Sequence, residues 1–401
     1  MNESKTFFPP LRSPRAQLAV LMLGHLLVDM YAGFLMPLVA PLKDHLGTRL
    51  SIASVVVGVS ILAVNGIQPL AGWISPRLRR PMFLLLGPLL AGAITMIGLS
   101  HNVWMVMLLA VVGHLGVGVY HPDALMAAQV LSGSRAHVGV PIFLSGGFFG
   151  FSLGALMGTQ WVSRFGFSGL WVVSLLSLPM LVLLVLTGLH RPEAKALRER
   201  AAVAASGDGP HLVLLAALSF LMGSSMFVLI MFLSVRLKER FEGPGIRWGG
   251  YAVALVGFSS AVASYGWGYL SKRISPFALI VTGQILGLPA YLLLIRSEIG
   301  WPILLLAVWA GSCMGGAFIP TIATLARRSP QLPPALRAGV IIGVPSGMAA
   351  LLAAGCGLLT DFGVTSEQIL LSTAALILAT AAVAFLAYLR GRKPVRSDVR
   401  A

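Results

Sequence analysis

Five ionisable side chains stand inside long apolar stretches of the sequence, where charge is costly. They are His25, Asp29, His114, His121 and Asp123. An ionisable group at membrane depth costs about 3 kcal/mol on insertion scales, so such residues are rare and usually functional. These five are therefore the candidates for proton transfer.

His25 and Asp29 are four residues apart, which places both on one face of a helix within hydrogen-bonding reach. An imidazole beside a carboxylate can gain and lose a proton as water access changes, which is what a proton carrier requires. The alternative is that the pair only ties its helix to a neighbour by hydrogen bonds. The cost of burying both groups favours the first interpretation, with Asp29 as the main proton site.

The remaining three candidates lie before and around Pro122. His114 and His121 are seven residues apart and share a helix face, whereas Asp123 points about 160° away from His121 on a regular helix. Proline removes a backbone hydrogen bond, and broken positions in membrane helices often lie beside cavities. We expect His121 to assist Asp29, and Asp123 to be either a proton site or a residue that orients a histidine. For His114 a structural and a functional role are equally supported.

Polar, aromatic and soft side chains in the apolar stretches are the candidates for a substrate cavity. Contact with lipid or hydrogen bonding between helices explains each of them singly, whereas together they would suit a variable apolar ligand. The predicted set is Tyr31, Asn65, Gln68, His114, Tyr120, Met226, Trp309 and Phe318.

A stripe of small residues recurs every four positions at Gly146, Gly150, Gly154 and Gly158. Such a stripe permits two helices to approach closely, and close packing is the simpler interpretation. The alternative is a smooth seam along which helices of opposite halves slide.

The elements that carry these residues must lie in lipid, because 57% of the 401 residues are hydrophobic and only 10% are charged. In soluble proteins about a quarter of the residues are charged. The net charge of +16 comes from short basic runs between apolar segments, which predicts no nucleic-acid partner. No phosphate loop, metal-binding spacing or nucleophile elbow is present, so we expect no enzyme, no ATP-driven pump, no cofactor and no metal.

Twelve apolar runs are long enough for spanning helices of roughly 20 residues. We predict an all-α membrane protein with spans at residues 17–41, 50–75, 81–100, 103–131, 138–163, 167–189, 211–235, 248–271, 275–295, 300–326, 338–360 and 366–389. Placing both termini in the cytoplasm puts 21 of the 29 Lys and Arg residues inside and 8 outside, as the positive-inside rule requires.

The chain also divides into two similar halves. Residues 190–210 predict a cytoplasmic linker between an N-terminal six-helix bundle at 1–189 and a C-terminal bundle with a basic tail at 211–401. The Gly-x-x-Ser-x-Arg motif from Gly72 to Arg77 recurs from Gly268 to Arg273. Two pseudo-symmetric six-helix repeats follow, as in many transporters.

The repeat and these loops resemble the major facilitator superfamily, although Pro76 and Lys272 stand where its loop motif has an acid. We expect Gly72 and Arg77 to act in conformational change. A closer resemblance is to the fosmidomycin resistance protein family. It rests on His25-Leu-Leu-Val-Asp29-Met30, Gln68-Pro69, Tyr120-His121-Pro122-Asp123 and Gly146-Gly147-Phe148-Phe149-Gly150. A basic residue expected shortly after Asp123 is absent.

The resemblance implies drug efflux across a bacterial-type inner membrane in exchange for protons. We therefore predict a monomeric, proton-coupled exporter whose partners are protons, membrane lipid and a small amphiphilic solute. Because no Lys or Arg falls within the predicted spans, we expect a neutral, zwitterionic, cationic or weakly acidic solute. The alternatives are a symporter importing a metabolite or siderophore, an uncoupled facilitator or lipid flippase, and a receptor or sensor.

Overall fold

The computed structural model describes residues 12–78, 80–133, 136–189, 210–241, 243–327 and 339–391. Within these ranges the regular secondary structure is helical throughout. It forms twelve segments of membrane-spanning length, several of which combine an α-helix with a 3-10 or π stretch, labelled η. Ten segments are long and apolar enough to cross a membrane, and the apolar segment Phe83–Leu99 and the more polar α10 (Gly245–Leu270) complete the set. The predicted twelve-helix, all-α membrane fold is confirmed.

The first half holds six of these segments. They are α1 (Pro14–Gly33) with η2 (Met36–Leu38) and α2 (Val39–His45), α3 (Leu50–Ile74) with η3 (Ser75–Arg77), α4 (Phe83–Ala91) with η4 (Gly92–Leu99), α5 (Val103–Ser132), α6 (Ala136–Phe165), and η6 (Leu170–Leu176) with α7 (Ser177–Thr187).

The second half holds the other six. They are α9 (Leu212–Arg240), α10, α11 (Pro276–Arg296), α12 (Trp301–Ala310) with η7 (Gly311–Gly315) and α13 (Gly316–Arg327), η8 (Gly339–Gly343) with α15 (Val344–Leu359) and η9 (Thr360–Phe362), and α16 (Ser366–Gly391). Residues 190–209 of the predicted linker lie outside the described residues, so the linker and the domain limits stay predictions.

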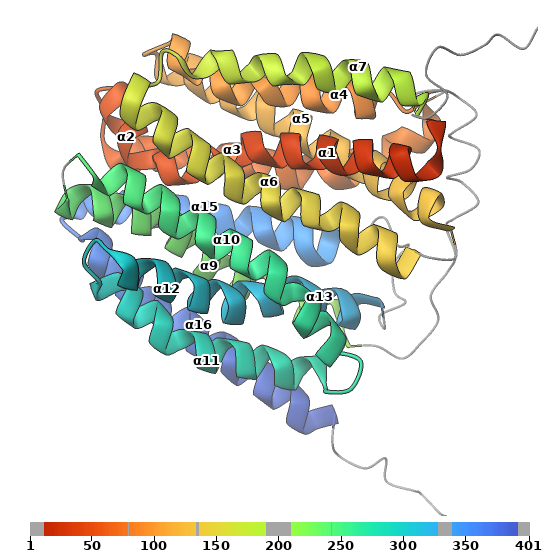
Figure 1. Cartoon of the computed structure of the whole chain (residues 1–401). Coiled ribbons are helices and arrows are strands. Elements are labelled where there is room, and N and C mark those ends of the chain that lie inside the picture. The colour runs from red at the N-terminus through yellow and green to blue at the C-terminus, as the bar shows by residue number, and fades with distance from the viewer. Residues whose placement is uncertain are drawn as a thin grey trace, which may run out of the picture.

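The two halves lie side by side, one in warm and one in cool colours (Figure 1). Within the first half α1 packs against α6 and α5, and within the second α16 packs against α9 and α11. The contact between halves is made mainly by α3 with α15 and by α6 with α10. These are the helices that any relative movement of the halves must displace.

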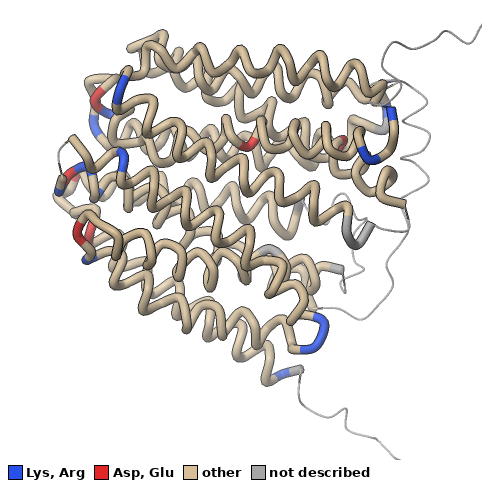
Figure 2. Tube along the Cα trace, viewed as in Figure 1, with Lys and Arg blue, Asp and Glu red and all other residues tan. Residues whose placement is uncertain are grey.

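Charged residues gather at the two ends of the helices and leave their middles almost bare (Figure 2). We call the end where α1 begins and α16 finishes the termini end, and the opposite one the short-loop end. Two ion pairs join the halves at the short-loop end: Lys238 on α9 bonds to Asp44 on α2, and Arg49 lies 3.8 Å from Asp361. In the part of the chain that the structure describes, both ion pairs between the halves lie at this end.

The small-residue stripe of α6 lies against the backbone of α1. A Cβ added at Gly150 would lie 2.2 Å from the Leu26 carbonyl oxygen, and one at Gly154 would lie 2.0 Å from that of Met30. Close packing therefore explains the stripe, and sliding between opposite halves does not, because α1 and α6 belong to one half. The contact of α6 with the other half uses a different face, where Gly250 of α10 meets Thr159.

Candidate functional site

Three ionisable side chains from two helices converge in the first half. The Nε2 atom of His25 lies 3.3 Å from Oδ2 of Asp29, and Nε2 of His121 lies 3.3 Å from Oδ1 of the same carboxylate. The two Nε2 atoms lie 3.1 Å apart. We call His25, Asp29 and His121 the triad. Its His25 to Asp29 spacing is the one that a regular α1 predicts, and α5 supplies the third member.

Both imidazoles are held by their other nitrogen. Nδ1 of His25 lies 2.9 Å from the Phe143 carbonyl oxygen of α6, and Nδ1 of His121 lies 2.7 Å from that of Val117, one turn earlier in α5. A carbonyl only accepts hydrogen bonds, so each Nδ1 carries the proton and Nε2 of a neutral ring presents a lone pair. Two lone pairs and a carboxylate then face one another, which requires at least one further proton among them.

Solvent access differs among the three members. The side chain of His25 is 4% exposed, whereas those of Asp29 and His121 are 19% and 24% exposed. Gly147 of α6 covers the triad: a Cβ at this position would lie 2.5 Å from both Oδ2 of Asp29 and Nε2 of His25. A glycine is therefore required beside the carboxylate. Two imidazole nitrogens and a carboxylate within 4.8 Å of one another are also donors that could hold a metal ion.

Asp123 lies apart from the triad, as its helical position predicts. Its carboxylate accepts a hydrogen bond from the hydroxyl of Ser75 in η3, and its side chain is buried. This bond connects the end of α3 to α5. His114 is buried as well, and its Nδ1 contacts the Ala110 carbonyl oxygen. The structure thus brings three of the five predicted ionisable residues into direct contact and leaves the other two outside that contact, with His114 near enough to interact electrostatically with Asp29.

The predicted cavity residues do not form one cavity: two tyrosines are buried within the first half, and Asn65 lies at the contact between the halves. Tyr31 and Tyr120 are fully buried inside the first half, where their hydroxyls donate to the carbonyl oxygens of Val173 and Leu21. They hold helices together and do not face the second half. Asn65 lies where α3 meets the second half: Cβ atoms added at Gly343 and Gly347 would meet its backbone oxygen and its Cβ, both at 3.3 Å.

The other predicted residues are more scattered. Gln68 is half-buried on α3, Met226 contacts Gly315 of η7, Phe318 packs in an apolar cluster with α9 and α11, and Trp309 is exposed on α12. Arg77 bonds to the Trp73 carbonyl oxygen and lies over its ring, with Cζ 3.8 Å from the centroid. Gly72 approaches Pro122 of α5, which a Cβ would meet at 3.8 Å.

Arg236 corrects the prediction that no Lys or Arg lies within a span. The predicted span ends at residue 235, but α9 continues to Arg240 and buries the Arg236 side chain to 3% exposure. Its guanidinium lies 3.7 Å from Glu367 at the start of α16. The end of the apolar run was therefore a poor guide to the end of the helix. An arginine one residue beyond it was the available signal.

The helical membrane fold and the family match together define a membrane transporter and not an enzyme. The family model described as Major Facilitator Superfamily matches residues 21–344, and the chain belongs to this superfamily. A mutant of the nucleoside transporter NupG superposes with a TM-score of 0.69 at 14% identity, covering 92% of this chain and 99% of that one. The tetrameric PepTSo2 superposes with a TM-score of 0.65 at 14% identity, covering 94% and 97%.

A curated relative matches a shorter part of the sequence. The fosmidomycin resistance protein of Escherichia coli (strain K12) is 26% identical over 150 residues. The match spans 37% of this chain and 37% of that protein, so little more than a third of the relative is represented.

Proposed function

We propose that this protein is a proton-coupled exporter of a small amphiphilic solute in a bacterial inner membrane. The observation that carries the proposal is the convergence of Asp29, His25 and His121, whose facing acceptors require a bound proton. Asp29 is the main proton site, and the two imidazoles share its proton. The partial similarity to a fosmidomycin resistance protein supports export.

The triad is placed to connect proton binding to movement of the halves. A proton shared among the triad holds α1 and α5 together, and its loss leaves the lone pairs and the carboxylate in mutual repulsion. Helix α6 accepts from His25 at Phe143 and covers the triad at Gly147. The same helix packs against α10 of the second half. A shift of α6 in response to the proton would therefore reach the other half by direct contact.

The solute site is expected between the halves, near Asn65 and Gln68. The described middle of the bundle offers no exposed cation there, which favours a neutral, zwitterionic, cationic or weakly acidic amphiphile. Arg236 does not change this expectation, because it lies at the short-loop end beside Glu367.

The substitution Asp29→Asn tests the proton site. Asparagine keeps the shape and hydrogen bonding of the carboxylate and removes its titration. We expect transport driven by a pH gradient to be abolished while the folded protein and gradient-free exchange of solute remain. The assay is flux into proteoliposomes with internal pH recorded, using an ethidium-type cation or a drug first found by thermal stabilisation.

Asp123→Asn is the matched control, since it neutralises a buried carboxylate of the same half outside the triad. It should keep gradient-driven transport. Normal coupling in Asp29→Asn would contradict the assignment and transfer it to Asp123. A wild-type protein indifferent to the gradient would be a facilitator or flippase, and one moving solute and protons in the same direction would be a symporter.

Orientation has its own test. We propose that both termini and the linker face the cytoplasm, because the Lys and Arg asymmetry requires it. In a background without Cys313 and Cys356, Ala204→Cys should stay unlabelled by an impermeant maleimide added to intact cells and should react after lysis. Labelling in intact cells would reverse the orientation.

A further inference from the structure

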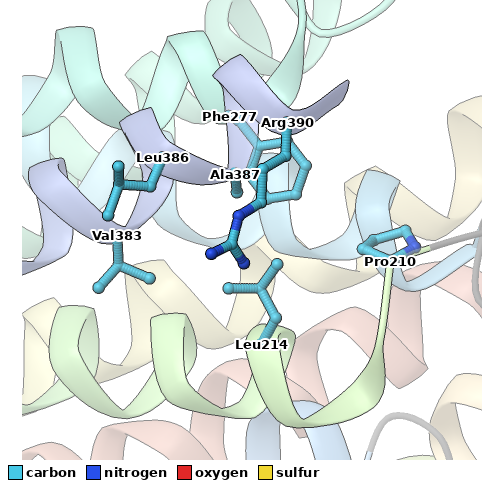
Figure 3. Close-up of a pocket in the computed structure, with 7 residues that line it drawn as sticks. All are labelled: Pro210, Leu214, Phe277, Val383, Leu386, Ala387 and Arg390. Carbon is cyan, nitrogen blue, oxygen red and sulfur yellow. The ribbon is translucent and has the colours of Figure 1, made fainter. Parts of the chain in front are cut away.

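A cavity of about 400 Å³ lies at the termini end of the second half, between α9, α11 and α16 (Figure 3). It is lined by Pro210, Leu214, Phe277, Val383, Leu386, Ala387 and Arg390. The guanidinium of Arg390 extends from α16 into the space beside Leu214 and Val383 (Figure 3). The triad lies in the first half, so this cavity is separate from the proposed proton site.

The lining is apolar except for that one cation. Leu214, Phe277 and Val383 pack against a buried cluster that includes Leu215 and Ile280, so the apolar wall is continuous with the core of the second half. Among the described residues no carboxylate pairs with Arg390. An apolar cavity with an unpaired cation at the end of a membrane helix is complementary to an amphiphile that carries one anionic head.

The surroundings place the cavity at a membrane surface. The turn between α10 and α11 carries Lys272 and Arg273, four to five residues before Phe277. Cζ of Arg273 lies 5.2 Å from the ring centroid of the exposed Tyr269. Tyrosine and basic residues concentrate where membrane helices meet the headgroups. Helix α11, which follows this turn, packs against α16, and Lys and Arg residues gather at the termini end (Figure 2).

We propose that this cavity binds one acyl chain of an anionic phospholipid from the leaflet at the termini end, with the lipid phosphate paired to Arg390. The guanidinium donates two parallel hydrogen bonds to phosphate oxygens, a geometry that lysine does not offer. The lipid connects α9, α11 and α16 and so couples the position of these three helix ends to the composition of the membrane.

Photolabelling in proteoliposomes tests the site. The probe is phosphatidylglycerol with a diazirine on one acyl chain, and the neutral comparison is the matching diacylglycerol, which lacks the phosphate. We expect saturable labelling of residues 210–214 and 383–387 by the anionic probe, about fivefold stronger than by the neutral one, since one basic residue near a surface contributes a preference of this size. Arg390→Gln should remove the preference. Arg296→Gln, at the other end of α11, should keep it.

A second variant tests the apolar part. Leu214→Trp fills the cavity and leaves Arg390 in place, so labelling should fall to about the level of non-specific background. The melting temperature should stay within a few degrees of the wild-type value. Equal labelling by both probes, no effect of Arg390→Gln, or displacement by inorganic phosphate alone would overturn the lipid site. Protection of the cavity by residues 190–209 of the same chain, seen as increased labelling when they are replaced by a Gly/Ser linker, would also overturn it.

Discussion

The two halves repeat one scaffold. In the first, Ser75 after α3 bonds to Asp123 of α5. In the second, the hydroxyls of Ser271 after α10 and Thr324 of α13 lie 3.2 Å apart. Gly72 and Gly268 complete the match, because a Cβ on each would meet a proline of the partner helix, at 3.8 Å and 3.5 Å.

The two halves differ in their buried ionisable residues and in how tightly their helices pack. Among the described residues the triad lies in the first half, whereas the second half buries the cation Arg236 in α9, where it pairs with Glu367 near the short-loop end. The helix contacts, which we call seams, differ too. In the first half α1 and α6 meet backbone to backbone at Gly154, whereas in the second half α9 and α15 leave room for a Cβ on Gly223, which would only touch Ala349 at 3.4 Å. The comparison indicates that the triad lies beside a tightly packed contact between α1 and α6, while the contact between α9 and α15 in the second half is looser.

The largest effect should come from the triad. His121→Ala removes one of the facing acceptors, and we expect the gradient-driven rate to fall by about 5- to 150-fold, the range of a coupling free energy of about 1–3 kcal/mol. His114→Ala, a buried histidine on the same helix outside the triad, should stay close to wild type. The two rates are compared in proteoliposomes at equal reconstitution. Equal loss in both variants would mean that the triad has no special role.

The next largest effect should be on stability. Gly154→Ala places a Cβ against the Met30 carbonyl oxygen, and because backbone cannot yield cheaply we expect a loss of about 1–3 kcal/mol. Gly223→Ala meets only ordinary contact and should be neutral or stabilise by up to about 1 kcal/mol. Thermal unfolding in one detergent measures both. Similar melting temperatures for the two variants would remove the proposed difference between the seams.

The smallest effect should come from giving the first half the same hydroxyl pair that the second half has. Asp123→Thr copies the hydroxyl pair of Ser271 and Thr324 into the first half. For the bond to Ser75 the change in stability should be about 0.5–1.5 kcal/mol, the size of one net hydrogen bond, and the pH dependence of transport should stay unchanged. Flux measured across a pH series decides this. A shifted profile would show that Asp123 titrates during transport and that the two positions are not equivalent.

Much of this architecture was predictable from hydropathy. A segment that crosses lipid must be helical and long enough to span it, so the twelve apolar runs predicted the twelve segments. Helical periodicity then predicted that His25 lies beside Asp29 and that Asp123 points away from His121. Periodicity predicts which residues share a face of one helix, but it does not predict which helices pack together. Contacts among α1, α5 and α6 decide that His121 closes the triad and that Gly147 covers it, and no spacing along the chain encodes them.

The structure places two sets of residues differently from the prediction, each for its own physical reason. Arg236 was excluded because an apolar run was taken to end where charge begins, yet a helix buries a cation when a carboxylate such as Glu367 lies within reach. Tyr31 and Tyr120 were predicted to line the substrate cavity. Their hydroxyls instead satisfy backbone carbonyls within the first half, which any buried tyrosine must do by some means.

The two ion pairs at the short-loop end should be sensitive to salt, because solvent reaches both of them. The Arg49 side chain is 77% exposed, so its attraction to Asp361 acts through water and is screened over about 8–10 Å at physiological ionic strength. The Lys238 and Asp44 pair is also reached by solvent. Salt in the solution at the short-loop end would weaken both ion pairs. A rise in salt concentration at the short-loop end would therefore weaken the electrostatic link between the two halves, while the buried packing of α3 with α15 and of α6 with α10 would remain.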